Sequence, residues 1–415
     1  MNNFLVAYMV GPEGKGLIYL LQFISGGIGL TLLSFGLGPT AIFYLSRDRG
    51  FSVSEIATGV FCASLLLGIL PMAILGPLWS WVGPMFTPKV SAGYVWLALA
   101  MIPAMTLTFN VGYICLGRGQ IRAYNWLRVA PSILFFLLLI LLLPTHQRRI
   151  WLVCLLWVAS VALPSCYALA LIRRWNGARH PRNSTSFLRI ALQFGWRSHL
   201  GAVTQYLQHR VDVLLVGYFL SLADLGIYAF AVSLAELLWY LPQAVGPVLM
   251  PHVAASSDDD ARRLTPIVCR ATLGVTALLS FALVAASACV IPAILPGFRS
   301  SIPVLWMLLP GIVVASIFKV LSSDFNGRGK PLKTLYPASA ALFACIVGGL
   351  LIIPRYGIIG EAVVTTAGYS LNSVLYLRSY SRITAVPIRD LLLLRRTDFF
   401  SMNQMWQAWR SQSTE

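Results

Sequence analysis

Charged residues are scarce in this chain of 415 residues: they make up 11% of it, while hydrophobic residues make up 58%. An ordinary soluble domain carries about 25% charged residues. A water-soluble fold cannot bury so much apolar side-chain surface and still keep a polar exterior. The composition therefore excludes a soluble enzyme and indicates a protein that lives in a membrane.

The sequence also lacks the patterns of a metal or disulfide site. Its seven cysteines lie in apolar runs without a C-x-x-C spacing, and its loop histidines are far apart. These patterns predict buried thiols, no metal site and no cofactor. No connection between apolar segments is long enough to form a catalytic domain, so we predict no catalytic residue and no enzyme.

Long apolar segments dominate what is present. Crossing about 30 Å of hydrocarbon takes roughly 20 apolar residues, and eleven segments meet that length: 17–45, 56–83, 92–116, 124–143, 150–172, 190–220, 225–250, 266–295, 302–323, 334–353 and 358–380. A short apolar stub at 4–10 precedes them, and a helix of that size is only about 10 Å long. The predicted fold class is an all-α polytopic membrane protein.

The net charge of +17 comes from 31 Lys and Arg residues against 14 Asp and Glu residues. Most of the basic residues lie in every second connection and in the C-terminal tail. Basic loops of membrane proteins stay in the cytoplasm. We therefore expect a multi-pass plasma-membrane protein with a cytoplasmic C-terminus, and we predict no nucleic-acid partner.

An internal repeat becomes visible when the chain is shifted by 210 residues. Gly16 then aligns with Gly226, and the tripeptide Gly117-Arg118-Gly119 aligns with Gly327-Arg328-Gly329. The shift advances the chain by six spans, an even number, so both copies have the same orientation. A parallel repeat of this kind predicts two six-helix lobes related by an axis along the membrane normal, with a cleft between them.

The repeat also predicts the domain organisation, with an N-terminal lobe at 1–172, a cytoplasmic interlobe loop at 173–187, a C-terminal lobe at 188–380 and a cytoplasmic tail at 381–415. In this alignment the first helix lacks about 20 residues, so it is expected to be truncated and the true start to lie upstream of Met1. The alternative is an eleven-span protein with its N-terminus outside.

Four segments carry a resemblance to a known family: "VGPEGKGLIYLL" at 10–21, the long run at 210–254, "GRGKPL" at 327–332 and "YGIIGEAVVTTAGYSLNSVLYL" at 356–377. They resemble bacterial oligosaccharide flippases of the multidrug/oligosaccharidyl-lipid/polysaccharide exporter superfamily. The resemblance implies twelve helices in two lobes. It also implies transport of an undecaprenyl-pyrophosphate-linked oligosaccharide from the cytoplasmic to the outer leaflet, and it is silent on the glycan.

Polar residues inside spans are the candidate site residues, because charge is costly in a bilayer. Segment 190–220 is polar on two sides: Arg197, Gln205, Gln208 and Asp212 follow one stripe, and Arg210 lies opposite. Arg197 and Arg210 are candidates for pyrophosphate contact, because a guanidinium offers a permanent charge and a planar fork. Structural pairing is the alternative for both.

Asp212 is the candidate for proton or sodium coupling, with a structural hydrogen bond as the alternative. Glu236, Tyr240 and Asn110 complete the expected substrate-binding set. The predicted partners are the lipid bilayer and a polyprenyl-pyrophosphate-linked glycan. Two other functions remain open: a cation-coupled extruder of small amphipaths and, less favoured, a membrane enzyme of polysaccharide assembly.

Overall fold

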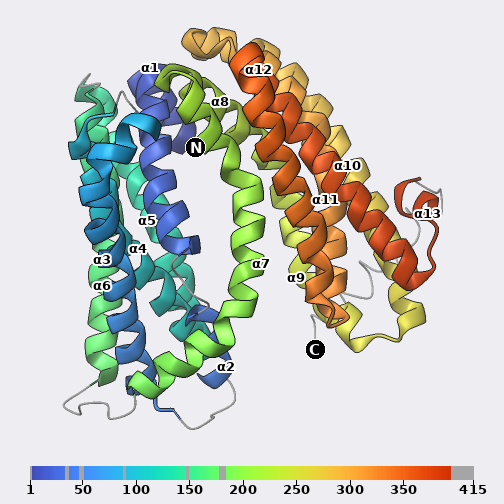
Figure 1. Cartoon of the computed structure of the whole chain (residues 1–415), viewed down its shortest axis with the longest axis horizontal. Coiled ribbons are helices and arrows are strands. Elements are labelled where there is room, and N and C mark those ends of the chain that lie inside the picture. The colour runs from blue at the N-terminus through green and yellow to red at the C-terminus, as the bar shows by residue number, and fades with distance from the viewer. Residues whose placement is uncertain are drawn as a thin grey trace. The chain divides into compact units, whose positions relative to one another are not determined.

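A computed structural model describes residues 2–32, 37–45, 51–86, 90–145, 149–176 and 184–393 (Figure 1). Within several helices the backbone alone is described, as at 192–198. Helices make up nearly all of these ranges, and no strand occurs within them. Apolar runs of this length in lipid must satisfy every backbone hydrogen bond internally, which is why they fold as helices.

The chain divides into two compact units, Met1–Phe230 and Ala231–Glu415. The first contains α1 (Asn2–Gln22), the π-helix η1 (Phe23–Leu32), α2 (Leu37–Leu45), α3 (Val53–Phe86), α4 (Ala92–Gly117), α5 (Ile121–Leu142), the short η2 (Leu143–Thr145), α6 (Ile150–Asn176) and α7 (Ser184–Phe219). The helix α8 (Leu222–Ala235) begins in the first unit and ends in the second.

The second unit continues with η3 (Glu236–Trp239), α9 (Tyr240–Ala255), α10 (Asp258–Ile294), η4 (Pro296–Phe298), α11 (Ser301–Gly327), η5 (Pro331–Thr334), α12 (Leu335–Thr384) and α13 (Ile388–Leu392). In this unit α11 packs against α9, α10 and α12. Within the predicted interlobe loop at 173–187, residues 177–183 lie outside the described residues and the two ends belong to α6 and α7, so the lobe boundaries stay a prediction.

Nine helical segments of the described chain are long and apolar enough to cross a bilayer. One of them, Leu332–Thr384, covers two of the eleven expected spans, while the more polar α7 is not among the nine. Each expected span falls on one helix or on consecutive helices. The prediction of an all-α polytopic membrane protein is confirmed.

The 50 residues of α12 form two helical arms joined at Gly357. A straight helix of that length would extend about 75 Å, far beyond a bilayer. The φ of 58° at Gly357 is open to glycine because it has no Cβ. The arms lie antiparallel, since a Cβ placed on Gly348 would lie 3.0 Å from the side chain of Val364.

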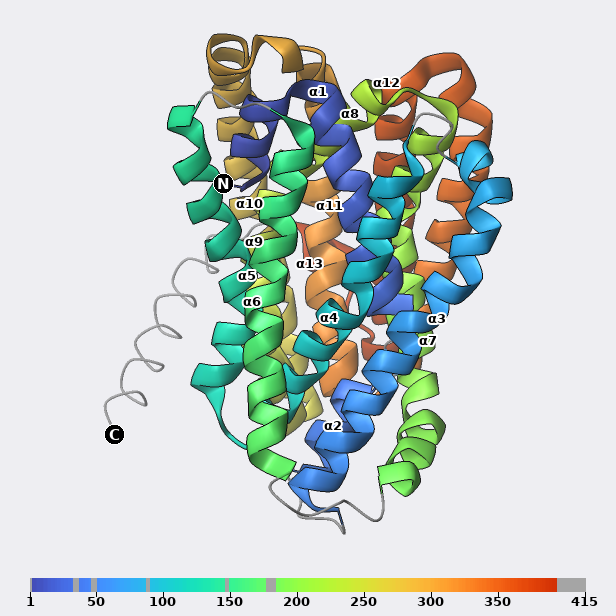
Figure 2. The same cartoon turned by 90° about the vertical axis from the view of Figure 1, so that its left-hand side faces the viewer.

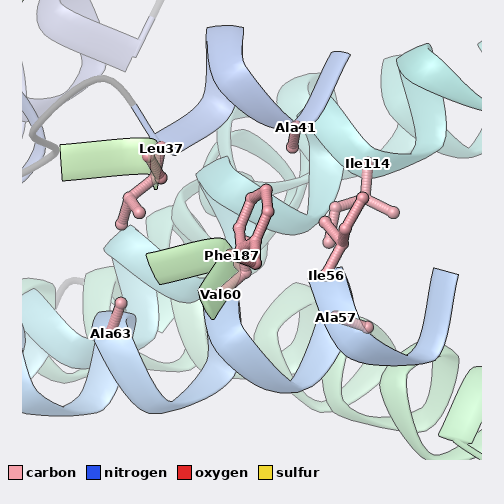
Figure 3. Packing of buried hydrophobic residues seen from close by; sticks show 9 residues of the cluster. Leu37, Ala41, Ile56, Ala57, Val60, Ala63, Ile114 and Phe187 are labelled. Atoms are coloured by element: carbon pink, nitrogen blue, oxygen red, sulfur yellow. The ribbon is translucent and has the colours of Figure 1, made fainter. Parts of the chain in front are cut away.

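In the first unit α4 packs against α3, α5 and α6, which run beside it (Figure 2). One core cluster joins four helices: Leu37 and Ala41 come from α2, Val60 from α3, Ile114 from α4 and Phe187 from α7 (Figure 3). The start of α7 is therefore anchored to the first unit by apolar contacts, although the sequence assigns this helix to the second lobe.

Candidate functional site

A buried lysine lies at the centre of the most polar contact in the first unit. Lys15 is 0% exposed, and its ammonium donates a hydrogen bond of 2.6 Å to Asn3 Oδ1. The same Nζ lies 5.4 Å from the centroid of the Tyr19 ring. Among the described residues no carboxylate pairs with Lys15. A buried cation is costly without an anion.

The chain bends back on itself to make this contact. Gly11 has a φ of 67° and separates the arm Asn2–Val10 from the rest of α1. That reversal returns Asn3 to the level of Lys15. On the short arm the Asn2 side chain also donates to the carbonyl of Ser132 on α5, at 2.9 Å. The stub expected from the sequence is therefore a packed helical arm.

Arg210 brings a second cation to the same place. Its Nη1 donates a hydrogen bond of 2.9 Å to the hydroxyl of Tyr19, across 191 positions of sequence. Tyr19 thus contacts both cations: the Lys15 ammonium lies near its ring, and the Arg210 guanidinium donates a hydrogen bond to its hydroxyl. We call Asn3, Lys15, Tyr19 and Arg210 the cationic cluster.

The carboxylate of Asp212 belongs to a neighbouring contact. Asp212 is buried; its Oδ2 accepts a hydrogen bond of 2.9 Å from the Tyr228 hydroxyl on α8, and its Oδ1 accepts one of 2.8 Å from the Val213 backbone N–H. Arg210 and Asp212 therefore contact different helices, as the two polar sides of segment 190–220 predict.

Two glycines let α1 and α8 approach closely enough to build these contacts. A Cβ on Gly16 would clash with the Leu222 carbonyl and lie 2.9 Å from the Gly226 nitrogen. A Cβ on Gly226 would clash with the Pro12 carbonyl and lie 2.8 Å from the Gly16 nitrogen. The contact is reciprocal, and its two glycines are 210 residues apart in the sequence.

The other candidate residues are dispersed. On α7, Gln208 is buried and Gln205 is exposed, and the Arg197 side chain lies outside the described residues. Asn110 is buried on α4 and donates to Ser64 Oγ at 3.1 Å. This contact joins α4 to α3 and involves no residue of the cationic cluster.

Glu236 and Tyr240 lie at the two ends of the 3₁₀ turn η3 in the second unit, in the middle of an expected span. Glu236 is half-buried, and Tyr240 is 71% exposed. Between them Trp239 lies beneath Lys319, whose Nζ is 4.1 Å from the ring centroid. A 3₁₀ stretch within a helix often marks a hinge.

Sequence reasoning missed Lys15, Tyr19 and Tyr228. The glycines and the proline of residues 11–16 read as a connection between helices, so Lys15 was counted with the loop residues. The signal that could have found it is its place inside "VGPEGKGLIYLL", one of the segments that carry the family resemblance. Nothing in the local sequence distinguishes Tyr19 and Tyr228 from the other tyrosines of the chain.

A family model described as "Polysaccharide biosynthesis protein" matches residues 32–297, more than half of the chain. The chain belongs to the polysaccharide biosynthesis protein family. This confirms the family resemblance that the sequence motifs carry. The family match and the long apolar helices of the described chain both indicate a multi-pass membrane protein.

One curated relative of this family member is the "Probable flippase AglR" of Haloferax volcanii, which is 22% identical over 194 residues. The match covers 45% of the chain and 40% of that relative, so the chain spans less than half the length of the protein it matches.

Two solved structures share the fold. The first is "Lipid II flippase MurJ, inward closed conformation", with a TM-score of 0.73, 14% identity and coverage of 94% of this chain and 86% of that one. The second is an inward-facing multidrug resistance MATE family transporter of the MOP superfamily, with a TM-score of 0.73, 17% identity and coverage of 92% and 93%. The family member thus has the fold of a membrane transporter.

Proposed function

We propose that the protein is a flippase that moves an undecaprenyl-pyrophosphate-linked oligosaccharide from the cytoplasmic to the outer leaflet of the bacterial plasma membrane. Transport occurs by alternating access between two lobes, and no covalent bond is made or broken. The family, the flippase relative and the fold shared with a lipid II flippase support this proposal. The orientation with a cytoplasmic C-terminus is part of it.

The observation that carries the proposal is the pair of cations on Tyr19. Lys15 donates to a neutral amide oxygen and Arg210 to a phenol hydroxyl. A pyrophosphate is a stronger acceptor for both, because hydrogen bonds between ionised groups are shorter and about twice as strong as neutral ones. In the proposed cycle the diphosphate displaces Asn3 and Tyr19 from the two cations.

The proposed residues divide between two tasks. Lys15 and Arg210, with Arg197 further along α7, hold the diphosphate, while Gln205, Gln208, Asn110, Glu236 and Tyr240 contact the glycan. Asp212 is the coupling residue, since a buried carboxylate next to a tyrosine hydroxyl can take up and release a proton. Its competing role is to fix α8 against α7.

A flipping assay tests the proposal. Purified protein in vesicles is given a fluorescent polyprenyl-pyrophosphate glycan, and an impermeant reagent measures how much of it reaches the opposite leaflet. We expect Lys15→Met and Arg210→Met to slow flipping at least about tenfold, since each loses a charged hydrogen bond worth about 1.5–3 kcal/mol. Arg210→Lys should recover part of the rate, because it restores the charge without the fork.

The matched control is Lys330→Met, which removes one exposed cation from the connection after α11. It should flip at the rate of the unaltered protein. If Lys15→Met and Arg210→Met flip the glycan lipid as fast as Lys330→Met and the unaltered protein do, the assigned site is contradicted. Mass analysis of the recovered glycan lipid tests the non-enzyme part: a covalently changed product would contradict it.

The second candidate function is a cation-coupled extruder of small amphipaths. Two observations favour it: the buried Asp212 carboxylate and the equal TM-score to a multidrug transporter. The same vesicles distinguish the two functions. Gradient-driven export of a cationic dye without movement of any glycan lipid would select the extruder.

A further inference from the structure

The first unit has a second cationic site, separate from the cationic cluster. A cavity of about 870 Å³ lies where α4 ends, α5 begins and α6 ends. Among the residues that the structure describes, its charged lining consists of Arg118, Arg122 and Arg174, and none of these lining residues is a carboxylate. Among the described residues no ion pair is formed by any of the three arginines. We call this cavity the arginine pocket.

The internal repeat provides a comparison for Arg118. Its counterpart Arg328 follows the same backbone turn: the glycines after them have φ values of 70° and 68°. The backbone N–H two positions after each arginine donates 2.8 Å to a carbonyl five residues earlier, Gln120 to Cys115 and Lys330 to Phe325. The two turns therefore differ in their side chains and not in their backbone.

The side chains around the two turns give opposite charge environments. Arg328 is paired with Asp324 at 2.6 Å and with Asp258 at 2.7 Å. The position that corresponds to Asp324 is Ile114, which is buried in the apolar core. The position that corresponds to Asp258 is Asp48, which lies outside the described residues. The first unit thus has a buried apolar residue where the second has the buried carboxylate that neutralises its arginine.

Two further features of the arginine pocket favour the binding of an anion. The Arg118 guanidinium lies 5.3 Å from the Trp175 ring, a cation–π contact that fixes its plane and lowers the entropy lost on binding. The first residues of α5 also line the cavity. The start of a helix carries a partial positive charge and backbone N–H groups that favour a phosphate.

We infer that the arginine pocket binds a phosphate group carried by a lipid: the headgroup of an anionic phospholipid or the diphosphate of a polyprenyl carrier. The pocket lies at the ends of membrane-spanning helices, where lipid phosphates lie. Its volume exceeds that of a single phosphate and leaves room for an attached glycerol or sugar. The inference does not depend on the proposed transport of a glycan lipid.

Binding is tested with the full chain in phosphatidylcholine nanodiscs. Three probes are titrated at low salt: inorganic pyrophosphate, phosphatidylglycerol and polyprenyl pyrophosphate. The test variant is the double variant Arg118→Gln with Arg174→Gln. The matched control is Arg299→Gln with Arg355→Gln, which removes two exposed arginines from other connections.

We expect the test variant to bind at least one lipid probe about tenfold or more weakly, while the control binds as the unaltered protein does. A loss limited to phosphatidylglycerol identifies the phospholipid as the source of the phosphate. A loss limited to polyprenyl pyrophosphate identifies the carrier, and a parallel loss with inorganic pyrophosphate shows that the phosphate alone is recognised. Equal affinity of test and control variants for both lipid probes would overturn the inference.

A second variant tests the inference without a change in folding. Gln120→Glu places one carboxylate on the wall of the pocket with almost no change in shape. It should weaken phosphate binding while the thermal midpoint stays unchanged, because residue 120 lies in the connection between α4 and α5. Unaltered lipid binding in this variant would contradict the inference independently of the arginine substitutions. Flipping by Lys15→Met variants is a separate readout, so failure of one proposal is distinguishable from failure of the other.

Discussion

Two carboxylates hold the Arg328 guanidinium, and they differ sharply in burial. Asp324 Oδ1 accepts from Nε at 2.6 Å and is 0% exposed, whereas Asp258 Oδ1 accepts from Nη1 at 2.7 Å and is 77% exposed. The Arg328 side chain is 7% exposed. Thr265 donates a further 2.6 Å hydrogen bond to Asp324 Oδ2. The two ion pairs share one cation, so substituting each carboxylate in turn isolates the effect of burial.

Removing the buried carboxylate should cost far more than removing the exposed one. Asp324→Asn leaves a buried guanidinium without its main counter-charge, a change worth about 3–5 kcal/mol in known cases. Asp258 still contacts Nη1, so we expect a loss near the lower end, about 3 kcal/mol. Asp258→Asn should cost at most about 1 kcal/mol, because water screens an exposed pair.

Burial and the neighbouring carboxylates have opposite effects on the pKa of Arg328. Burial, the largest single influence, acts to lower the pKa of the Arg328 guanidinium. The hydrogen bond and charge of Asp324, together with the charges of Tyr380 and Asp258, outweigh it, so the pKa is raised above its ordinary value. Arg328 therefore stays charged at any physiological pH, and its need for a counter-charge does not depend on pH.

The assay is thermal unfolding of the purified protein in detergent, followed by tryptophan fluorescence, at low salt and at 1 M salt. The Debye length at 1 M is about 3 Å, so salt should erase the effect of Asp258→Asn and leave that of Asp324→Asn. Asp259→Asn is the control, since Asp259 is exposed and makes only a 3.7 Å pair with Arg262. Equal losses of stability for Asp324→Asn and Asp258→Asn would refute the reasoning.

Two further predictions concern the contacts of α8. Gly226→Ala should lower stability by about 1–3 kcal/mol, because its new methyl group meets the backbone of α1 at Gly16 and the helices must separate. Gly93→Ala, which meets nothing closer than 3.8 Å, should be neutral or stabilising in the same thermal assay, and a similar loss in both would contradict this account. Asp212→Asn should abolish the dependence of transport on an ion gradient if the carboxylate titrates, whereas Tyr228→Phe should keep that dependence and cost about 1 kcal/mol from one lost hydrogen bond. Retained gradient dependence in Asp212→Asn vesicles would leave Asp212 with a structural role only.

The sequence by itself determined the fold class and the position of the helices. Apolar length and the cost of unpaired backbone groups in lipid leave the chain no alternative to spanning helices. The break at Gly357 is predictable too, since it falls between the expected spans 334–353 and 358–380. The two polar sides of segment 190–220 could also be predicted, because the 3.6-residue period of an α-helix fixes which residues share a face.

Only the tertiary structure decided which polar residues meet. Lys15 reads as a loop residue, yet the reversal at Gly11 buries it beside Tyr19 and Arg210. That contact joins residues 191 positions apart, and no local period encodes such a pairing. The difference between Arg118 and Arg328 was hidden in the same way, because their tripeptides are identical.

Residues from distant helices complete the surroundings of those two arginines. Asp324 is one helical turn before Arg328, but its carboxylate is held in place by Thr265, which reaches it from α10. Trp175 reaches Arg118 from the far end of α6. The identical tripeptides therefore belong to an ion-pair network in one unit and to a cationic pocket in the other, because the residue four positions before each arginine differs and distant helices supply Thr265 and Trp175.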